Sequence, residues 1–214
     1  MPVIITGDGS KTIYSNRFKE HYHSTFGAAK ESEHVFIEAG YLATTTDPAS
    51  ALEIGYGTGL NAWLTLQQAI QLNRRTWYEA VEMYPIDEAT ACELSNDQLF
   101  RDLHNAPWEQ PAEITSSFVL YKRFNDLSQT VFSRKFDVVY FDAFSPAVQP
   151  EMWTRDVFAK LFATMNSGAV LTTYCAKGEV RRTMQSVGFS VERLPGPAGK
   201  REMLRAVKDL RNFL

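Results

Sequence analysis

Three acidic residues stand at the ends of predicted strands, where a carboxylate can accept protons and hydrogen bonds from a bound ligand. Asp142 follows the near-continuous apolar run of residues 136–141, a pattern typical of a buried central strand in a parallel sheet. Glu53 and Glu82 lie in or just after two earlier apolar runs. Ligands of open α/β sheets bind outside the carboxyl ends of the strands, so we expect these carboxylates to gather at one site. Asp142 is the predicted catalytic residue, and capping of the following turn is its alternative role.

A glycine-rich turn follows Glu53. Gly55, Gly57 and Gly59 occupy alternate positions between an apolar run and a helical pattern. Glycines allow positive φ and have no Cβ, so a ligand can lie against the backbone amides at the helix start. An acid here favours a ligand whose nearby part is cationic, such as the amino group or sulfonium of S-adenosylmethionine. The pattern resembles motif I of the class I S-adenosylmethionine-dependent methyltransferases; an NAD-binding loop or a purely structural turn is the alternative.

Apolar runs and helical patterns alternate along the rest of the chain, which predicts a doubly wound, Rossmann-like α/β fold of the class I methyltransferase type. We expect core strands at residues 51–54, 76–81, 117–121, 136–141 and 169–173. The intervening helices are predicted at residues 61–71, 86–94, 154–165 and 179–187. Two last strands, at residues 189–193 and 203–207, are expected to add an antiparallel C-terminal hairpin to a mostly parallel sheet.

The chain divides at about its first predicted core strand. Residues 1–46 are expected to form a small extension or cap that packs on the core, and turn chemistry between two apolar runs predicts a hairpin within residues 2–15. Residues 47–214 are expected to form a single globular methyltransferase domain. A chain of 214 residues with 44% hydrophobic content is long enough for one well-buried domain and short for two.

In a fold of this type, three further residues are expected to contact the cofactor. Glu82 stands 23 residues past Gly59, at the tip of the second strand, where a carboxylate can accept hydrogen bonds from both ribose hydroxyls. A solvent-exposed acid at a strand end is the alternative. Asn125 and Asp126 follow the third strand and are expected to accept from the adenine amine, with Asp126 the better candidate. Asp142 completes the expected cofactor-binding set.

Charge is unevenly distributed along a chain whose net charge is −3. Residues 79–113 hold nine acids and one base, whereas residues 170–214 hold nine bases and four acids. The basic end permits a polyanionic partner without proving one. The chain start lacks the features of a signal peptide and no stretch approaches 18 apolar residues, so a cytoplasmic, membrane-free protein is expected. His21, His23 and His34 lack a closed ligand set, and no metal site is predicted.

One long segment carries a more specific resemblance. Residues 140–153 read Tyr-Phe-Asp-Ala-Phe-Ser-Pro-Ala-Val-Gln-Pro-Glu-Met-Trp. Together with residues 21–24, 31–32, 34–37 and 199–204, this segment is similar to the tRNA 5-aminomethyl-2-thiouridine methyltransferase family, and the similarity covers nearly the whole chain. It implies methyl transfer from S-adenosylmethionine to the exocyclic amine of a modified wobble uridine in the tRNA anticodon.

The resemblance also implies a place in a reaction sequence. Bifunctional members of the family carry an FAD-dependent oxidase domain, for which these 214 residues have no room. We therefore expect other enzymes to make the 5-aminomethyl precursor on tRNA before this chain acts. No separate protein partner is expected.

The implied chemistry assigns roles to residues around Asp142. An alkylamine has a pKa of about 10, so its deprotonation at neutral pH costs roughly 4 kcal/mol. Asp142 is expected to accept the amine's hydrogen bond and proton, while the Ala143 carbonyl holds a second hydrogen. Among the available rings, Phe144 and Tyr22 are the first choices to stack on the displaced base; the others are Phe18, Phe26 and Trp153. The residues expected to contact tRNA phosphates are Arg181, Arg182, Lys200 and Arg201.

Two other functions are compatible with the same pattern. A small-molecule amine methyltransferase or a polyamine aminopropyltransferase uses this fold, and the acidic segment favours it. A non-catalytic cofactor-binding or RNA-binding module is the third possibility. Three acids at strand ends oppose that third function, because a site without chemistry has no physical need for them.

Overall fold

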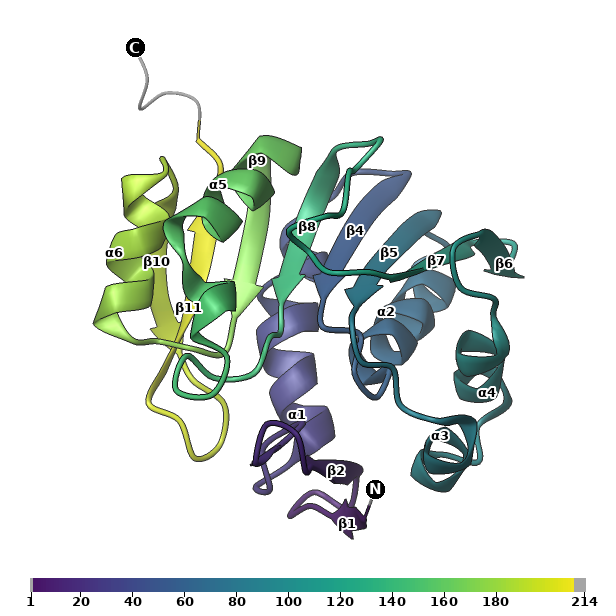
Figure 1. Ribbon diagram of the computed structural model, residues 1–214. Coiled ribbons are helices and arrows are strands. Elements are labelled where there is room, and N and C mark those ends of the chain that lie inside the picture. The colour runs from purple at the N-terminus through teal and green to yellow at the C-terminus, as the bar shows by residue number, and fades with distance from the viewer. Residues whose placement is uncertain (1, 210–214) are drawn as a thin grey trace.

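A computed structural model describes residues 2–209 (Figure 1). The described residues contain one large sheet with the strand order β10-β11-β9-β8-β4-β5-β7-β6. Strands β9, β8, β4, β5 and β7 are mutually parallel, and β6, β11 and β10 join by antiparallel pairing. The strand bounds are β4 Ala49–Ile54, β5 Thr76–Glu82, β6 Pro111–Thr115, β7 Phe118–Phe124, β8 Phe136–Phe141, β9 Met165–Thr173, β10 Ser190–Pro195 and β11 Glu202–Val207.

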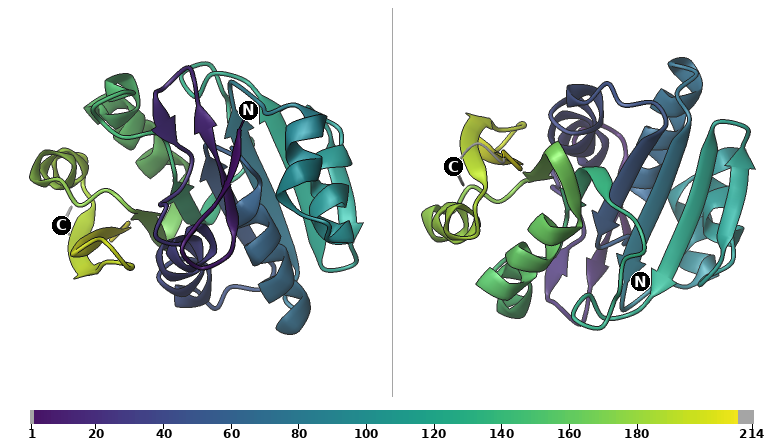
Figure 2. Two further views of the ribbon diagram at one scale, coloured as in Figure 1. Left: turned by 90° about the horizontal axis from the view of Figure 1, so that it is seen from below. Right: turned by 90° about the horizontal axis from the view of Figure 1, so that it is seen from above.

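Helices cover both faces of this sheet (Figure 2). They are α1 Ala28–Ser32, which continues into the π-helical turn η1 Glu33–Glu38, then α2 Leu60–Gln71, α3 Glu88–Leu94, α4 Gln98–Asn105, α5 Arg155–Thr164 and α6 Gly178–Ser186. Short 3₁₀ turns lie at η2 Tyr41–Ala43 and η3 Pro150–Trp153. Asp87 and Asp97 start α3 and α4 by accepting hydrogen bonds from the backbone of the first turn.

Alternate residues of the central strands build two separate cores. Ala51 of β4 and Tyr140 of β8 face a core that includes side chains of η1, α2 and α4. Leu52 and Phe141, one position along in the same strands, face the core formed with α5 and α6. This separation follows from the two-residue period of a strand. Because both faces are covered, β8 is buried at every position, as a central parallel strand requires.

The N-terminal residues form a second, smaller sheet of strands β1 Val3–Ile5, β2 Lys11–Ser15 and β3 Glu20–His21. This sheet lies beyond the carboxyl ends of the central strands of the large sheet, at the lower edge of the molecule in Figure 1. Ser145, just past β8, donates from its backbone N–H and its hydroxyl to the Glu20 carboxylate. Segments from opposite parts of the chain therefore meet over the edge of the sheet where ligands of such folds bind.

The predicted mixed sheet and its antiparallel hairpin are confirmed, with strand ends shifted by a few residues. The acidic segment holds two elements that the sequence did not predict, helix α4 and the edge strand β6. β7 also runs three residues further than expected, to Phe124. Edge strands such as β6, which is exposed or half-buried throughout, lack the continuous apolar pattern that identifies a buried strand. Within residues 2–209, no helix is long and apolar enough to cross a membrane.

The glycine-rich turn joins β4 to α2 in a left-handed backbone conformation. Gly55, Gly57 and Gly59 have φ values of 90°, 52° and 75°. A Cβ on Gly55 would stand 2.7 Å from the carbonyl oxygen of Asp142. The ends of β4 and β8 approach this closely because Asp142 N–H donates to the Ile54 carbonyl at 3.0 Å. The turn thus fixes the position of Asp142 relative to the start of α2.

Gly55→Ala is expected to lower the free energy of unfolding by about 3 kcal/mol, because it combines left-handed backbone strain with a clash against a backbone atom. Gly168→Ala is the matched control, since Gly168 has a φ of 78° but no atom within 4 Å of its added Cβ. The control should lose only about 1 kcal/mol, from backbone strain alone. Urea denaturation measures both values, and equal losses would show that the Asp142 carbonyl imposes no constraint on this turn.

Candidate active site

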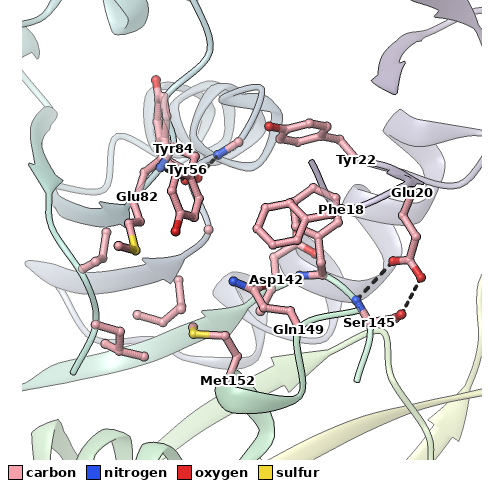
Figure 3. A pocket seen from close by; sticks show the side chains of 18 of the residues that line it. Phe18, Glu20, Tyr22, Tyr56, Glu82, Tyr84, Asp142, Ser145, Gln149 and Met152 are labelled. Carbon is pink, nitrogen blue, oxygen red and sulfur yellow. Dashed lines mark hydrogen bonds between the residues drawn. The ribbon is translucent and has the colours of Figure 1, made fainter. Parts of the chain in front are cut away.

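A cavity of about 490 Å³ opens at the carboxyl edge of the sheet, between the glycine-rich turn, the end of β8 and the N-terminal extension (Figure 3). Nine of the predicted site residues line it: Tyr22, Gly55, Gly57, Glu82, Asn125, Asp126, Asp142, Phe144 and Lys200. Five do not: Glu53, Gly59, Arg181, Arg182 and Arg201. The structure therefore brings together residues separated by up to 178 positions in the chain.

Glu82 ties the glycine-rich turn to the end of β5. Its carboxylate accepts from Gly57 N–H at 3.0 Å and from Tyr84 N–H at 2.7 Å. Burial raises the pKa of Glu82, while these backbone donors act in the opposite direction. Each carboxylate oxygen has a second lone pair, so the side chain can still accept hydroxyl protons from a ligand in the cavity.

Asn125 and Asp126 form a tight turn directly after β7. Asn125 Oδ1 accepts from Asp126 N–H at 2.8 Å, and Asp126 Oδ1 accepts from Ser128 N–H at 2.7 Å. Asn125 N–H donates to the Glu82 carbonyl at 3.1 Å, which holds the turn beside β5. Asp126 Oδ2 has no protein donor among the described residues, and the side chain lines the cavity. This oxygen can accept from an amine.

Glu53 lies behind the cavity wall, which differs from the expected direct contact with a ligand. The side chain is fully buried, and its two oxygens accept from Tyr78 Oη at 2.8 Å and from Asn61 Nδ2 at 2.9 Å. Asn61 Nδ2 also donates to Asp142 Oδ2 at 2.8 Å. Burial raises the pKa of Glu53 well above its usual value, and the nearby Asp142 adds to the rise. Between Glu53 and the cavity stands Asn61, a lining residue that sequence reasoning missed.

Asp142 is placed to exchange a proton near neutral pH. Burial raises the pKa of Asp142 to about 7; the hydrogen bond from Asn61 and the charge of Lys200 lower it, and Glu31 raises it. A group with a pKa close to the working pH is an efficient proton acceptor.

Lys200 occupies a different environment from the one expected of a phosphate contact. Its Nζ lies 2.6 Å from Glu31 Oε2 and 4.2 Å from the centre of the Tyr174 ring. Tyr174 Oη donates to the Ala143 carbonyl at 2.9 Å. The Ala143 carbonyl, which is expected to hold a substrate hydrogen, therefore already accepts one hydrogen bond from the protein. Lys200 forms an ion pair with Glu31 inside the cavity.

Aromatic rings form one side of the cavity (Figure 3). Phe144 stacks on Phe18 with 4.3 Å between ring centres, and Tyr22 meets Phe144 edge-on at 5.0 Å. Tyr84 lies edge-on to Phe18 at 5.8 Å. Trp153 is buried and donates to the Phe144 carbonyl at 2.8 Å, so it supports this wall from behind. Sequence reasoning named Phe18 only as an available ring, because an aromatic residue in a loop carries no pattern of its own.

The remaining basic residues lie outside the cavity. Arg181 and Arg182 are on α6, where Arg181 is half-buried and Arg182 exposed. Arg201 is exposed and lies directly before β11. Because α6 follows β9 and β11 returns antiparallel to it, all three lie towards the carboxyl edge where the cavity opens.

The described residues contain no cluster of acids, cysteines and histidines that could hold a metal ion. His23 instead joins β2 to the glycine-rich turn, with Nδ1 3.1 Å from Thr12 Oγ1 and Nε2 3.3 Å from Thr58 Oγ1. Burial lowers the pKa of His23 to about 4. The ring is therefore neutral at pH 7 and serves as a hydrogen-bonding spacer.

This chain is similar to known proteins in sequence and in fold. The chain is 32% identical to the tRNA 5-methylaminomethyl-2-thiouridine biosynthesis bifunctional protein MnmC of Magnetococcus marinus, over 92% of this chain and 32% of that protein. It is 30% identical to the protein of the same name from Nitrosospira multiformis, over 90% of this chain and 35% of that protein. The chain thus spans about a third of the length of these curated relatives.

Two solved structures show the same fold. The crystal structure of MnmC2 from Aquifex aeolicus superposes with a TM-score of 0.82 at 24% identity, covering 96% of this chain and 69% of that one. The glycopeptide N-methyltransferase MtfA complexed with sinefungin gives 0.51 at 16% identity, covering 86% and 88%. The family model described as S-adenosyl-L-methionine-dependent methyltransferase matches residues 98–209, just over half of the chain. The chain belongs to this family of S-adenosyl-L-methionine-dependent methyltransferases.

Proposed function

We propose that this methyltransferase acts on the amine of 5-aminomethyl-(2-thio)uridine at the wobble position of tRNA and yields the 5-methylaminomethyl product. The observation that carries the proposal is the position of Asp142, whose pKa is about 7, in one cavity with the stacked rings of Phe18 and Phe144. An amine on an aromatic base needs both features. The names of the curated relatives, which refer to 5-methylaminomethyl-2-thiouridine biosynthesis, support the same substrate.

The cavity fits the cofactor through its hydrogen-bond acceptors. Glu82 is placed to accept from ribose hydroxyls and Asp126 Oδ2 from the adenine amine, while the bare backbone of the glycine-rich turn permits close approach. When bound, S-adenosylmethionine supplies a methyl group on a sulfonium centre. Asn61 and, behind it, Glu53 hold Asp142 in place.

Asp142 acts on the substrate amine. Its carboxylate accepts a hydrogen bond from the amine and takes a proton as the new C–N bond forms and the methyl–sulfur bond breaks, with S-adenosylhomocysteine as the leaving group. A carboxylate also stabilises the ammonium form of the substrate, so its benefit comes from orientation and from proton acceptance during the reaction. The Ala143 carbonyl, already bonded to Tyr174, keeps one lone pair with which to orient the amine.

The aromatic rings bind the displaced base of the tRNA, and the basic residues bind its phosphates. Phe144 and Tyr22, with Phe18, form the face on which the displaced base stacks. The residues that contact phosphates around the cavity mouth are Arg181, Arg182 and Arg201. Lys200 instead forms an ion pair with Glu31 and offsets the negative charge of that acid inside the cavity. Residues 1–46 serve as a cap on the methyltransferase domain, residues 47–214. The chain acts in the cytoplasm, after other enzymes have made the aminomethyl group.

A small polyamine is the competing substrate, because Glu20, Glu31, Glu82 and Asp142 all line the same cavity. The deciding experiment uses labelled S-adenosylmethionine and bulk tRNA from cells that lack this activity, followed by mass analysis of the nucleosides. Gain of one methyl group on 5-aminomethyluridine species is the expected result. Cofactor binding without transfer to tRNA, together with transfer to polyamines, would replace the proposal by the competing function.

Asp142→Asn is expected to lower kcat by at least about 100-fold, because the introduced amide cannot accept the amine proton. The dissociation constant for S-adenosylhomocysteine, measured by calorimetry, should change only a few fold. Asp126→Asn is the matched control at the adenine side and should weaken cofactor binding while leaving kcat at saturating cofactor nearly intact. Parallel losses of turnover and cofactor affinity in Asp142→Asn would contradict a role in proton acceptance.

The same substitution is expected to stabilise the fold at alkaline pH. Between the ordinary carboxyl pKa of 3.8 and the folded value of about 7, the folded protein keeps a proton that the unfolded chain releases. Stability attributable to Asp142 therefore falls as pH rises through this window. Asp142→Asn should gain up to about 4 kcal/mol in free energy of unfolding at pH 8 and almost nothing near pH 4. A pH-independent difference in urea titrations would rule out this linkage.

Binding of tRNA should weaken steeply with salt. Neutralising Arg182 and Arg201 by Arg→Gln is expected to flatten the slope of log affinity against log salt by about 0.7 for each phosphate that the variant no longer neutralises. Arg205→Gln is the control on the same hairpin, because Arg205 pairs with Glu192 at 2.6 Å. An unchanged slope in the double variant would place the phosphates elsewhere on the surface.

A further inference from the structure

We propose that Gln149 determines base specificity by donating a hydrogen bond from its side-chain amide to the C4 carbonyl of the modified uracil. Gln149 lies just before η3 and lines the same cavity as Asp142 and Phe144. Figure 3 shows Gln149 near Asp142. The inference rests on the proposed function and adds the residue that distinguishes uridine from cytidine.

The hydrogen bonds of Gln149 fix which end of its amide faces the cavity. Its Oε1 accepts from Phe144 N–H at 3.1 Å. A backbone N–H can only donate, so the amide oxygen must face Phe144 and the NH₂ group must point away from it. No described residue accepts a hydrogen bond from Nε2, and Figure 3 shows the amide nitrogen directed into the cavity. The cavity therefore contains an oriented donor without a protein partner.

The segment that carries this donor is held at several points. Gln149 N–H donates to the Ser145 carbonyl at 2.9 Å, and the Gln149 carbonyl accepts from Met152 N–H at 3.2 Å. Ser145 is in turn bound through its N–H and hydroxyl to the Glu20 carboxylate of β3. Since backbone and side chain are both anchored, the amide can impose a direction on a ligand rather than adapt to it.

The donor complements one edge of the proposed substrate. In a 5-aminomethyluracil, the amine and the C4 carbonyl are attached to neighbouring ring atoms. When the amine donates to Asp142, the C4 carbonyl beside the aminomethyl group also lies in this part of the cavity. Its oxygen is an acceptor, and the Gln149 NH₂ group is the donor available to it. In cytosine the C4 substituent is itself an amine, so two donors would face each other. Rotating the Gln149 amide would not help, because its NH₂ group would then face Phe144 N–H.

The test compares anticodon stem-loop RNAs that carry 5-aminomethyluridine or 5-aminomethylcytidine, with kcat/KM measured for each. Gln149→Glu keeps an acceptor for Phe144 N–H and so preserves the local fold, but it presents an acceptor to the cavity. We expect Gln149→Glu to lose about 10- to 100-fold on the uridine RNA and to favour the cytidine RNA over it. Gln149→Met should lower activity on uridine and remove the preference. Met152→Leu, another change in the cavity wall, is the control and should keep the wild-type preference.

Three results would overturn the assignment. An unchanged uridine-to-cytidine ratio in both Gln149 variants would leave Gln149 a structural role only. A matching loss of S-adenosylhomocysteine affinity, measured by calorimetry, would assign the amide to the cofactor instead. Absence of methyl transfer to the uridine RNA by the unaltered protein would refute the proposed function and the role of Gln149 with it. The first two results would refute only the role of Gln149.

Discussion

The structure depends on burying carboxylates at the ends of parallel strands. Glu53 is the penultimate residue of β4, Glu82 is the last residue of β5 and Asp142 directly follows β8. Burial raises the pKa of all three. Such groups weaken a fold unless donors surround them. Asn61, the backbone of the glycine-rich turn and the Tyr78 hydroxyl supply those donors. The same contacts that make the burial tolerable also fix the direction in which Asp142 and Glu82 face the cavity.

Acids elsewhere in the chain have mainly structural tasks. The role of the acidic segment of residues 79–113 was not evident from its composition. Glu79 forms a buried ion pair with Arg123 at 2.6 Å, Asp87 and Asp97 begin helices, and Glu109 accepts from Phe124 N–H. A local charge of −8 therefore says little about a polycationic ligand, because many of these acids are already engaged in caps and pairs.

Sequence patterns predicted the sheet, most of its helices and the acids at the strand ends, because buried strands and glycine-rich turns have strong local signatures. They did not predict Asn61, Gln149 or the pairing of Lys200 with Glu31. Asn61 is an ordinary polar residue in a helix, and its importance arises only when Asp142, 81 positions later, comes within 2.8 Å. Contacts of this kind depend on tertiary packing, which no local spacing encodes.

Two contacts join the N-terminal extension to the β10–β11 hairpin, and the second of them lies in the cavity wall. His34 Nε2 lies 2.8 Å from the carbonyl of Pro195, 161 positions later, and Lys200 Nζ reaches Glu31. Contacts across so long a sequence distance form late, because much of the chain must be ordered before they can close. On a ribosome, the central sheet can assemble while the last hairpin is still being made, but the cavity stays open on that side. The wall of the cavity is therefore complete only after residues 190–207, which form β10 and β11, have been synthesised and have folded back onto the sheet.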